Sequence, residues 1–283
     1  MCETAQFRLA VGFFDGVHLG HQAILRGASA ALTFENHPLS VLAPERAPRL
    51  LMSWEDRAKT IMALGVKVTA LEFDRDLAAR SPEEFLALMR CLAPDRTLSV
   101  RCGANWRFGR DGAGDADWLR ARGVPVTVVP YVDFQGEPVS STRIRAALGR
   151  GEIEAANAML GRPYAVRGAV VKGKGLGTKL GYPTINLVPA SPDRAEARLP
   201  VPLGVYAVEI GGVRGVANYG VAPTTGAAAW TSPVFEVHLL GSPADVSDVS
   251  VVSVLRFLRP ERKFASTDEL KAQIALDAAE AAR

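Results

Sequence analysis

The sequence predicts two domains of different class: an α/β domain with a mostly parallel sheet, then an antiparallel β-barrel or sandwich that ends in a helix. Strand-like and helix-like segments alternate in the first half, as in parallel sheets covered by helices. In the second half, β-like runs follow one another, separated by Gly, Pro and Asp, which is typical of antiparallel folds. A boundary at Gly161 gives domains 1–160 and 161–283.

The elements of the first half follow from short β-rich runs and capping signals. Ser53 and Ser81 each stand three residues before an acidic residue, the spacing of a capping box, and Pro82 occupies a first helical position. Helices are therefore expected from 53 to 64 and from 81 onward, with a shorter one over 18–26. Strands are expected at 7–11, 31–34, 66–73, 98–102 and 125–129.

Two further short helices are expected before the boundary, at 141–148 and 153–160, each followed by Gly. A last helix is expected from Ser266, which forms another capping-box pattern with Glu269, to about residue 282. Between them, strands are expected at 164–171, 204–210, 213–218, 234–240 and 249–258.

Composition and charge narrow the class of protein. Of 283 residues, 48% are hydrophobic and 22% are charged, which is typical of a globular chain. The net charge of +3 gives no indication of a nucleic-acid or membrane partner. The three cysteines lack paired spacing, and no apolar run approaches the ~20 residues that span a bilayer. We expect a cytoplasmic protein with small-molecule partners that is a monomer or a weak homo-oligomer.

Residues 11–21 predict a strand that enters a glycine-bearing turn and then a helix. A helix N-terminus offers unpaired N–H groups and positive charge, which suit phosphate. Gly12 and Gly16 allow close approach of the backbone to a ligand. His18 and His21 project from the same side of the first turn, where two imidazoles can donate hydrogen bonds to a triphosphate. The alternative is a plain strand–turn–helix with two incidental histidines.

Two more segments carry polar groups in places that suit ligands. His37 follows the second expected strand, and ligands bind where strands of open α/β sheets end, although a plain turn is an equal interpretation. Three hydroxyls and an arginine at the start of the 141–148 helix suggest a second phosphate cradle; taken alone, they predict only a cap and a basic helix. This second group comprises Ser140, Ser141, Thr142 and Arg145.

These segments resemble motifs of the prokaryotic bifunctional riboflavin kinase/FMN adenylyltransferase (FAD synthetase) family over nearly the whole chain. Residues 12–21 resemble its GxFDGxHxGH motif, which contains the HxGH signature of nucleotidyltransferases, and 140–145 resemble SSTxIR. Residues 33–38 resemble TFxPHP, and 103–109 resemble GxNFxFG. The resemblance implies a Rossmann-like nucleotidyltransferase domain followed by a riboflavin kinase barrel with a terminal helix.

The resemblance also implies roles for residues of the first half. His18, His21 and Arg145 would be catalytic, and the flavin would be bound by His37, Asn105 and Arg107. The implied ATP-binding residues are Gly12, Phe14, Gly16, Ser140, Ser141 and Thr142.

The second half carries the motifs that the resemblance assigns to the kinase. Residues 180–186 resemble LGxPTxN, which implies Mg²⁺ contacts for Thr184 and Asn186, and their oxygens are of the hard kind that Mg²⁺ prefers. Residues 234–239 resemble an ExHL strand, which implies that Glu236 accepts the proton of the riboflavin 5′-hydroxyl. An outward-facing charge is the alternative for Glu236. Further implied ATP-binding residues are Gly173, Gly175, Gly177 and Pro183; they lack Walker spacing.

The chain departs from the family at three places. Eleven residues separate His21 from Thr33, where the family usually has about twenty, so the connection after the histidines must be short. Asn36 replaces the usual Pro, and residues 245–248 lack the usual Tyr-Gly.

We expect both halves to be active, because the key side chains are present. ATP and Mg²⁺ would serve two steps, the phosphorylation of riboflavin to FMN and the adenylylation of FMN to FAD with release of pyrophosphate. A kinase with a degenerate first half and a non-catalytic flavin-binding regulator are the alternatives. A nucleic-acid role has less support, because no basic stripe is visible.

Overall fold

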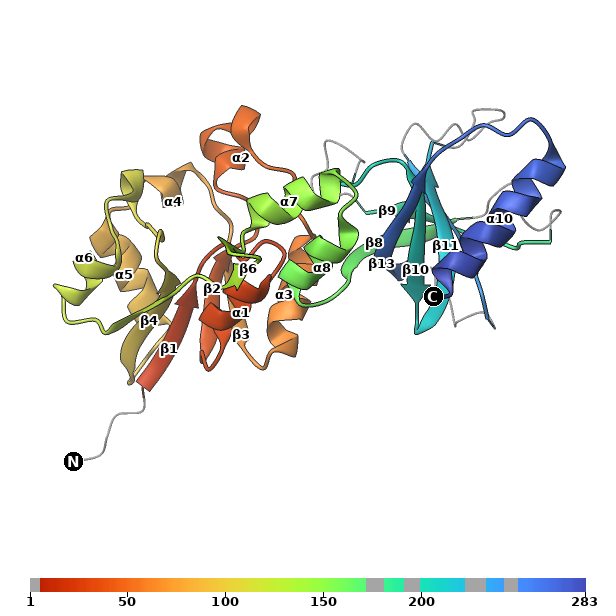
Figure 1. The fold of residues 1–283 in the computed structure, drawn as a ribbon. Helices are drawn as coiled ribbons and strands as arrows, with labels where there is room; N and C mark the ends of the chain where they lie inside the picture. The colour runs from red at the N-terminus through yellow and green to blue at the C-terminus, as the bar shows by residue number, and fades with distance from the viewer. Residues whose placement is uncertain (1–5, 172–180, 191–198, 222–232, 242–248) are drawn as a thin grey trace. The chain divides into compact units, whose positions relative to one another are not determined.

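The computed structural model of the chain describes residues 6–171, 181–190, 199–221, 233–241 and 249–283 (Figure 1). The chain forms two compact units. One comprises the residues up to 50 together with 54–140, and the other comprises 51–53 and 141–283. Each unit has its own sheet, and the two sheets differ in class as the sequence predicts.

The first unit is built on a parallel sheet with the strand order β3-β2-β1-β4-β5. Strand β1 pairs with β2 on one side and with β4 on the other, so the chain reverses its direction of travel across the sheet at this point. In open α/β sheets, ligands bind at such a switch point, at the carboxyl ends of the strands. The strands are β1 (Gln6–Val11), β2 (Ala30–Phe34), β3 (Lys67–Leu71), β4 (Thr97–Gly103) and β5 (Val126–Val129).

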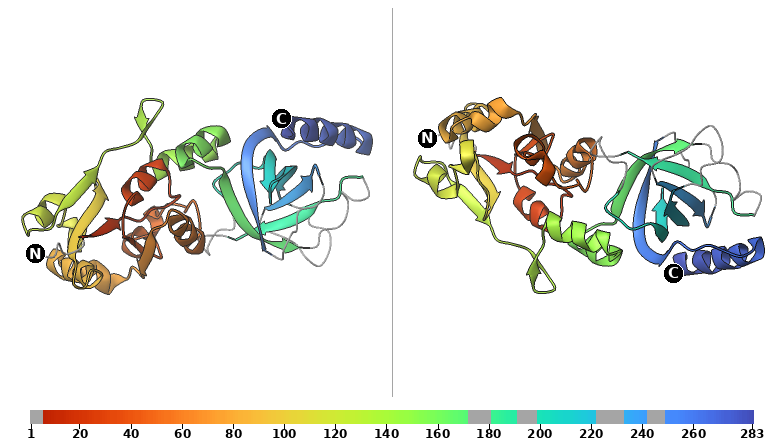
Figure 2. Two further views of the ribbon diagram at one scale, coloured as in Figure 1. Left: turned by 90° about the horizontal axis from the view of Figure 1, so that it is seen from below. Right: turned by 90° about the horizontal axis from the view of Figure 1, so that it is seen from above.

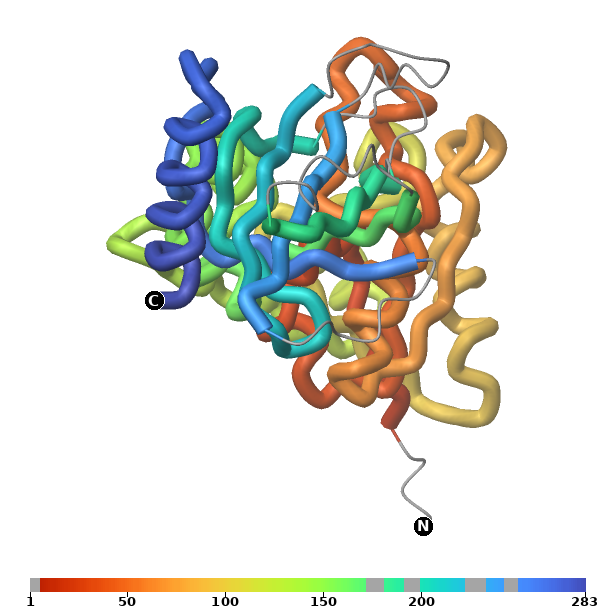
Figure 3. The backbone as a smooth tube through the Cα atoms, turned by 90° about the vertical axis from the view of Figure 1, so that its right-hand side faces the viewer, coloured from red at the N-terminus to blue at the C-terminus, as the bar shows by residue number. Residues whose placement is uncertain are grey.

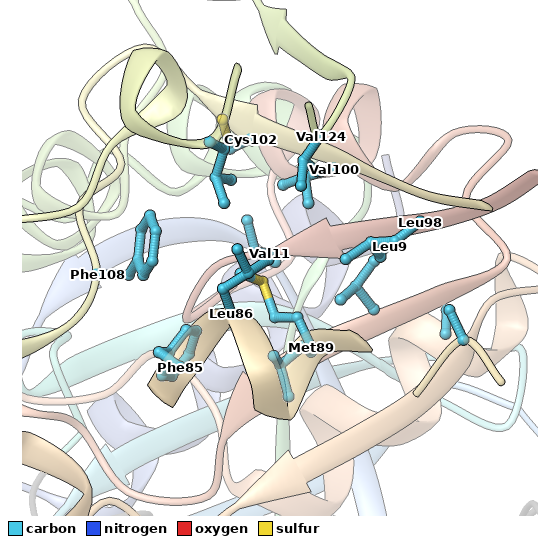
Figure 4. Close-up of a cluster of buried hydrophobic side chains, with 14 residues drawn as sticks. Leu9, Val11, Phe85, Leu86, Met89, Leu98, Val100, Cys102, Phe108 and Val124 are labelled. Carbon is cyan, nitrogen blue, oxygen red and sulfur yellow. The ribbon is translucent and has the colours of Figure 1, made fainter. Parts of the chain in front are cut away.

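Helices cover both faces of this sheet. On one face, Leu9 and Val11 of β1 pack against Phe85 and Met89 of α5 (Pro82–Cys91) (Figure 4). Each such buried side chain contributes roughly 1.5–3 kcal/mol. Helix α6 (Ala116–Arg120) adds the buried Leu119 to this cluster.

On the other face lies α1 (Leu19–Leu25). Arg101 alternates along β4 with the buried Val100 and Cys102, and it donates hydrogen bonds to the carbonyls of Ala23 (3.1 Å) and Ile24 (2.9 Å). Side chains on alternate strand positions point to opposite faces, so these bonds place α1 opposite α5.

The expected capping boxes have different outcomes. Ser81 and Glu84 form a complete capping box at the start of α5, as the sequence predicts. Ser266 caps α10 (Thr267–Ala281), but the Glu269 carboxylate accepts its bond from the Ala265 N–H rather than from Ser266. The predicted capping box at Ser266 is therefore only half formed.

The first unit contains one more predicted helix and several helices and strands that the sequence does not predict. Helix α3 (Trp54–Ala63) falls within the expected 53–64 segment. The additional elements are α2 (Leu39–Leu42), η1 (Pro44–Arg46), α4 (Arg75–Ala79), η2 (Arg110–Gly112) and a hairpin of β6 (Asp133–Phe134) and β7 (Glu137–Pro138).

The second unit is a closed antiparallel barrel with the strand order β10-β11-β12-β9-β8-β13 (Figure 2). Closure removes the unpaired strand edges that an open sheet would expose. The strands are β8 (Tyr164–Val171), β9 (Ile185–Pro189), β10 (Gly204–Ile210), β11 (Val213–Gly220), β12 (Val234–Leu239) and β13 (Val249–Pro260). Strand β9 was not among the expected strands.

Three helices accompany the barrel in the part of the second unit that the structure describes. Helix α8 (Ile153–Leu160), which packs against α7 (Ser141–Gly149), is fixed by Asn157, whose amide donates to the Val254 carbonyl (2.9 Å) and accepts from the Tyr164 N–H (2.7 Å). Helix α10 lies along β10 and β11 (Figure 3). The buried Asp277 of α10 holds Arg259 of β13 through hydrogen bonds of 2.6–3.2 Å.

Candidate active sites

The first candidate site is the turn between β1 and α1. Phe14 (φ 58°) and Val17 (φ 41°) adopt left-handed backbone conformations although both carry side chains, and both are buried. Non-glycine residues in this region cost of order 1–3 kcal/mol each and cluster at functional sites. A hydrogen bond from the Val17 N–H to the Phe14 carbonyl (2.9 Å) closes the turn. The chain thus maintains a strained turn at the carboxyl end of the central strand.

The two histidines of the turn lie against one another. His18 is the N-cap of α1, and its Nδ1 accepts a hydrogen bond from the His21 N–H (3.3 Å). Their imidazole rings stack with centroids 3.5 Å apart. A Cβ at Gly20 would lie 3.2 Å from the His18 ring, so the glycine between the histidines gives this ring its space. The spacing of the motif therefore creates both the cap and the stacked pair.

His21 is held in its neutral form. Burial removes water from its imidazole and lowers its pKa well below the usual 6.5, and electrostatic interactions with His18 and Arg57 lower it further. Its Nδ1 atom is buried, and none of the described residues forms a hydrogen bond with it. A neutral imidazole can still donate one hydrogen bond to a phosphate oxygen.

The proposed flavin-binding residues follow other strands at the same edge of the sheet. His37 comes after β2; its Nδ1 accepts from the Leu39 N–H (3.1 Å), and its ring lies 4.7 Å from the Phe13 ring. Asn105 comes after β4 and is exposed. Arg107 is also exposed. It forms a salt bridge with Asp115, the N-cap of α6, so it has a structural role that is independent of any ligand.

The hydroxyl and arginine group lies at the division between the units. Ser140 is the last residue of the first unit, whereas Ser141, Thr142 and Arg145 belong to α7 in the second unit. Their role in binding ATP stays a prediction.

The second candidate site is a row of polar side chains across the barrel. Strand register places Glu236 of β12 directly opposite Asn186 of β9 on one side and Asn218 of β11 on the other. Directly opposed residues of antiparallel strands project from the same face. The row continues through Val205 of β10 to Arg259 of β13. Five residues that are far apart in the sequence thus lie side by side on adjacent strands, linked by four strand pairings.

Next to this row lies a cavity of about 330 Å³. Barrel strands supply one wall, and Leu270, Ile274 and Asp277 of α10 supply another. Of the residues in the row, Val205, Asn218, Glu236 and Arg259 line the cavity, as does Thr184. Other residues of the lining are Tyr182, Val216, His238, Glu261, Arg262 and Phe264. This cavity combines apolar walls with a few convergent polar groups, which is the usual composition of a small-molecule site.

Glu236 is exposed, but the surrounding protein takes away part of its hydration, and this desolvation raises the pKa of its carboxyl. A carboxylate with a raised pKa is a stronger base once it is ionised. Pro183 is fixed nearby, because its carbonyl accepts a hydrogen bond from His238 Nδ1 (3.0 Å). Gly173, Gly175 and Gly177, also predicted to bind ATP, lie outside the described residues.

The chemistry of Thr184 and Asn186 fits the implied Mg²⁺. Asn186 is a buried polar residue beside Glu236, and Thr184 lines the cavity, so hydroxyl and amide oxygens are available. Among the described residues, no group of three or more His, Cys, Asp or Glu side chains could hold a metal. Two neutral oxygen ligands suit an ion that is held mainly by nucleotide phosphates.

Comparison with known proteins finds a match for each half of the chain. The FAD synthetase family model matches residues 3–143, and the riboflavin kinase family model matches residues 160–283. The bifunctional riboflavin kinase/FMN adenylyltransferase of Escherichia coli (strain K12) is 36% identical over 95% of this chain and 90% of its own length. That of Bacillus subtilis (strain 168) is 32% identical over 99% and 93%.

The chain belongs to the bifunctional riboflavin kinase/FMN adenylyltransferase family. Among solved structures, one described as a macrolide-efflux protein from Streptococcus pneumoniae matches with a TM-score of 0.80 and 29% identity over 96% of this chain and 92% of that one. In the part of the chain that the structure describes, no helix is long and apolar enough to span a membrane.

Two departures from the family pattern have a structural explanation. The short connection after His21 is accommodated because α1 ends at Leu25 and β2 begins at Ala30. Asn36, which replaces the family's usual Pro, donates to the Phe73 carbonyl (2.9 Å) and accepts from the Phe73 N–H (2.8 Å). Its amide thus ties the segment after β2 to the segment after β3.

Several residues of the two candidate sites have no signal in the sequence that marks them. Asn218 and Asp277 line the barrel cavity, and Asn218 donates to Glu261 (3.1 Å). Arg57 is fully buried beside the histidine turn. The alternation around Glu236 indicates which residues share its face, but only strand pairing identifies Asn218 as its neighbour.

Proposed function

We propose that this member of the family carries out both reactions, each with its own group of residues: phosphorylation of riboflavin at the barrel, and adenylylation of FMN by the residues of the histidine turn and the α7 segment. The observation that carries the proposal is the polar row Asn186–Glu236–Asn218 beside a cavity, in a fold unit separate from the stacked His18–His21 pair. Two sets of motifs thus form two arrangements with different chemistry.

In the kinase reaction, the riboflavin 5′-oxygen attacks the γ-phosphorus of ATP. A new O–P bond forms, the bond to the β-phosphate oxygen breaks, and ADP leaves. Glu236 takes the proton of the hydroxyl, and Asn186 and Asn218 flank it along the row. Thr184 and Asn186 would hold Mg²⁺, which neutralises phosphate charge when bound. Pro183 and the glycines Gly173, Gly175 and Gly177 would contact ATP.

In the adenylyltransferase reaction, a phosphate oxygen of FMN attacks the α-phosphorus of ATP, and pyrophosphate leaves. No proton must be removed from an ionised phosphate, so the protein's task is to position the reactants and stabilise charge. His18, His21 and Arg145 would stabilise the charge on the transferring phosphates. The backbone at Gly12, Phe14 and Gly16, with Ser140, Ser141 and Thr142, would cradle ATP, while His37, Asn105 and Arg107 would face the flavin.

The domain boundary, Mg²⁺ dependence, location and assembly of the chain follow from the same two reactions. We assign the functional boundary to 160/161, since the kinase family model begins at residue 160 and the FAD synthetase model ends at 143. We further propose Mg²⁺ dependence of both steps, a cytoplasmic location where ATP is available, a monomeric or weakly associating chain, and no nucleic-acid partner.

Incubation of the purified protein with riboflavin, ATP and Mg²⁺, followed by chromatography of the flavins, tests this function. The expected result is FMN that appears first and FAD that follows, with both absent when Mg²⁺ is chelated. Accumulation of FMN without FAD would support the kinase-only alternative. Bound but unconverted riboflavin would support the regulator.

A further inference from the structure

Arg57, near the start of α3, is a buried guanidinium in the first unit that none of the motifs described above contains. Its side chain has no solvent exposure. The Nη2 group donates hydrogen bonds to the carbonyls of Phe34 (2.6 Å) and Glu35 (2.8 Å), where β2 ends. The guanidinium also lies 4.0 Å from the centroid of the Phe13 ring.

These contacts join the two segments that carry the candidate site residues. Phe13 belongs to the turn that leads to His18 and His21, and its ring also contacts His37 edge-on at 4.7 Å. Phe34 and Glu35 lead directly into His37. A single side chain therefore holds the segment after β1 and the segment after β2 in a fixed relation, at the sheet edge where ligands of open α/β folds bind.

The buried guanidinium has a cost for folding stability as well as these stabilising contacts. Nε and Nη1 of Arg57 are buried, and no described residue accepts a hydrogen bond from either. An unpaired buried donor costs about 1–3 kcal/mol, so these two groups offset part of what the two hydrogen bonds contribute. Burial lowers the pKa of Arg57 to about 10, partly offset by Asp15, so the side chain remains charged at neutral pH.

The charge acts on the histidine turn. Arg57 is close enough to His21 to contribute to the lowering of that residue's pKa. Buried Asp15 is the nearby negative group on the same turn. Adenylyl transfer brings a triphosphate and then pyrophosphate to this region, and a fixed cation in a water-poor setting stabilises such charge without rearrangement.

We propose that Arg57 is a positioning residue of the adenylyltransferase reaction: it locks the segments after β1 and β2 together and places a permanent positive charge behind the histidine pair. This inference rests on the proposed function of the first unit. Because Arg57 acts through Phe13, the Phe34 and Glu35 carbonyls and the histidine pair, its replacement should reduce turnover more than it reduces stability.

The test compares Arg57→Met and Arg57→Lys with the wild type in the conversion of FMN to FAD, with kcat and KM determined separately. Methionine keeps much of the volume but removes the charge and both hydrogen bonds. We expect its kcat to fall by about 10–100-fold, the scale of a small misplacement of reacting groups. Lysine keeps the charge and an N–H donor group, but not the planar guanidinium, and should restore part of kcat. Conversion of riboflavin to FMN should stay unchanged in both variants.

Arg120→Met is the matched control, because Arg120 also donates to a strand carbonyl (Val126, 3.1 Å) in the same unit but lies on the exposed surface of α6. It should keep wild-type FAD synthesis. A wild-type kcat in Arg57→Met would overturn the proposal. So would a loss that disappears on assay well below a lowered unfolding temperature, since that pattern indicates a purely structural role.

Failure of the proposed function gives a different result. In that case the wild type itself makes no FAD from FMN and ATP, and ATP binding measured by calorimetry replaces turnover as the readout. Arg57→Met is then expected to bind ATP several-fold more weakly than both the wild type and Arg120→Met. Equal affinities would reject the role of Arg57.

Discussion

Burial shifts pKa values in opposite directions in the histidine turn and in the barrel row. In both sites desolvation favours the neutral form of a titratable group, so the pKa of His21 falls and that of Glu236 rises. A neutral imidazole is already suited to donate a hydrogen bond to phosphate, so deep burial suits its proposed task. Glu236 must be ionised to accept a proton, and its remaining exposure keeps ionisation accessible.

The two sites also differ in how the chain assembles them. The first concentrates its strained turn, helix cap and stacked rings within residues 12–21. The second distributes its groups over neighbouring strands and the helix α10, which Asp277 fastens to Arg259. We infer that local sequence changes affect the first site directly, whereas the second depends on the integrity of the barrel.

The sharpest test of this separation is Glu236→Gln. The amide keeps the shape of the side chain but cannot act as a base, so formation of FMN from riboflavin should fall by roughly 10²–10⁴-fold. Conversion of supplied FMN to FAD should be unchanged. Glu209→Gln, on strand β10 of the same barrel, is the matched control and should retain both activities. Loss of both reactions in Glu236→Gln would contradict two separate sites.

His21→Ala should produce the reverse pattern. Removal of an imidazole that stabilises transferring phosphate should reduce formation of FAD from FMN by about 10²–10³-fold. The kinase reaction should be spared, because His21 and the barrel row belong to different units. Arg26→Ala, at the exposed end of the same helix, serves as the control. An unchanged yield of FAD in the His21 variant would remove that residue from the mechanism.

Most strands and helix starts could be predicted because their signals are local. Ser81 and Glu84 predict the start of α5, and the β-rich runs of the first unit form its parallel sheet. Closure of the barrel has no local signal. Strand β13 pairs with β8 through Val249–Val254 and with β10 through Ser253–Pro260, and register shifts against β10 accompany this change of partner. Such a shared strand cannot be inferred from alternation alone.

The site residues also differ in whether a local sequence signal predicts them. His18, His21 and Glu236 stand in recognisable sequence patterns, so they could be predicted as site residues from the sequence alone. Arg57 lies in an ordinary helical segment, and only packing reveals that it is buried and faces Phe13. Asp277 is likewise one acidic residue among several in α10 until its contact with Arg259 is known.

Acidification should separate the two reactions without any mutation. As pH falls from about 8 to about 5, the kinase rate should decline as Glu236 is protonated, and its raised pKa places this decline above the range of an ordinary glutamate. His21 stays neutral below 6.5 because its pKa is lowered. Separate assays of the two reactions should show that the kinase weakens first. The opposite order would contradict the assigned roles.

Gly220→Ala should give the smallest effect and would show how closely the barrel site depends on its surroundings. A Cβ at Gly220 would lie 2.0 Å from the Glu261 carboxylate and 2.9 Å from the Asn218 amide, so the two side chains would have to separate. Because Glu261 is the end of a flexible side chain, we expect only a several-fold rise in the KM for riboflavin. Formation of FAD from FMN should not change.

The matched control for this last variant is Gly241→Ala. A Cβ there would make an ordinary contact, 3.4 Å from Val213, and the residue does not line the cavity. Its kinetic constants should match those of the wild type. If Gly220→Ala also leaves the KM for riboflavin unchanged, the contact between Asn218 and Glu261 has no part in flavin binding, and the functional row ends at Glu236 and Asn186.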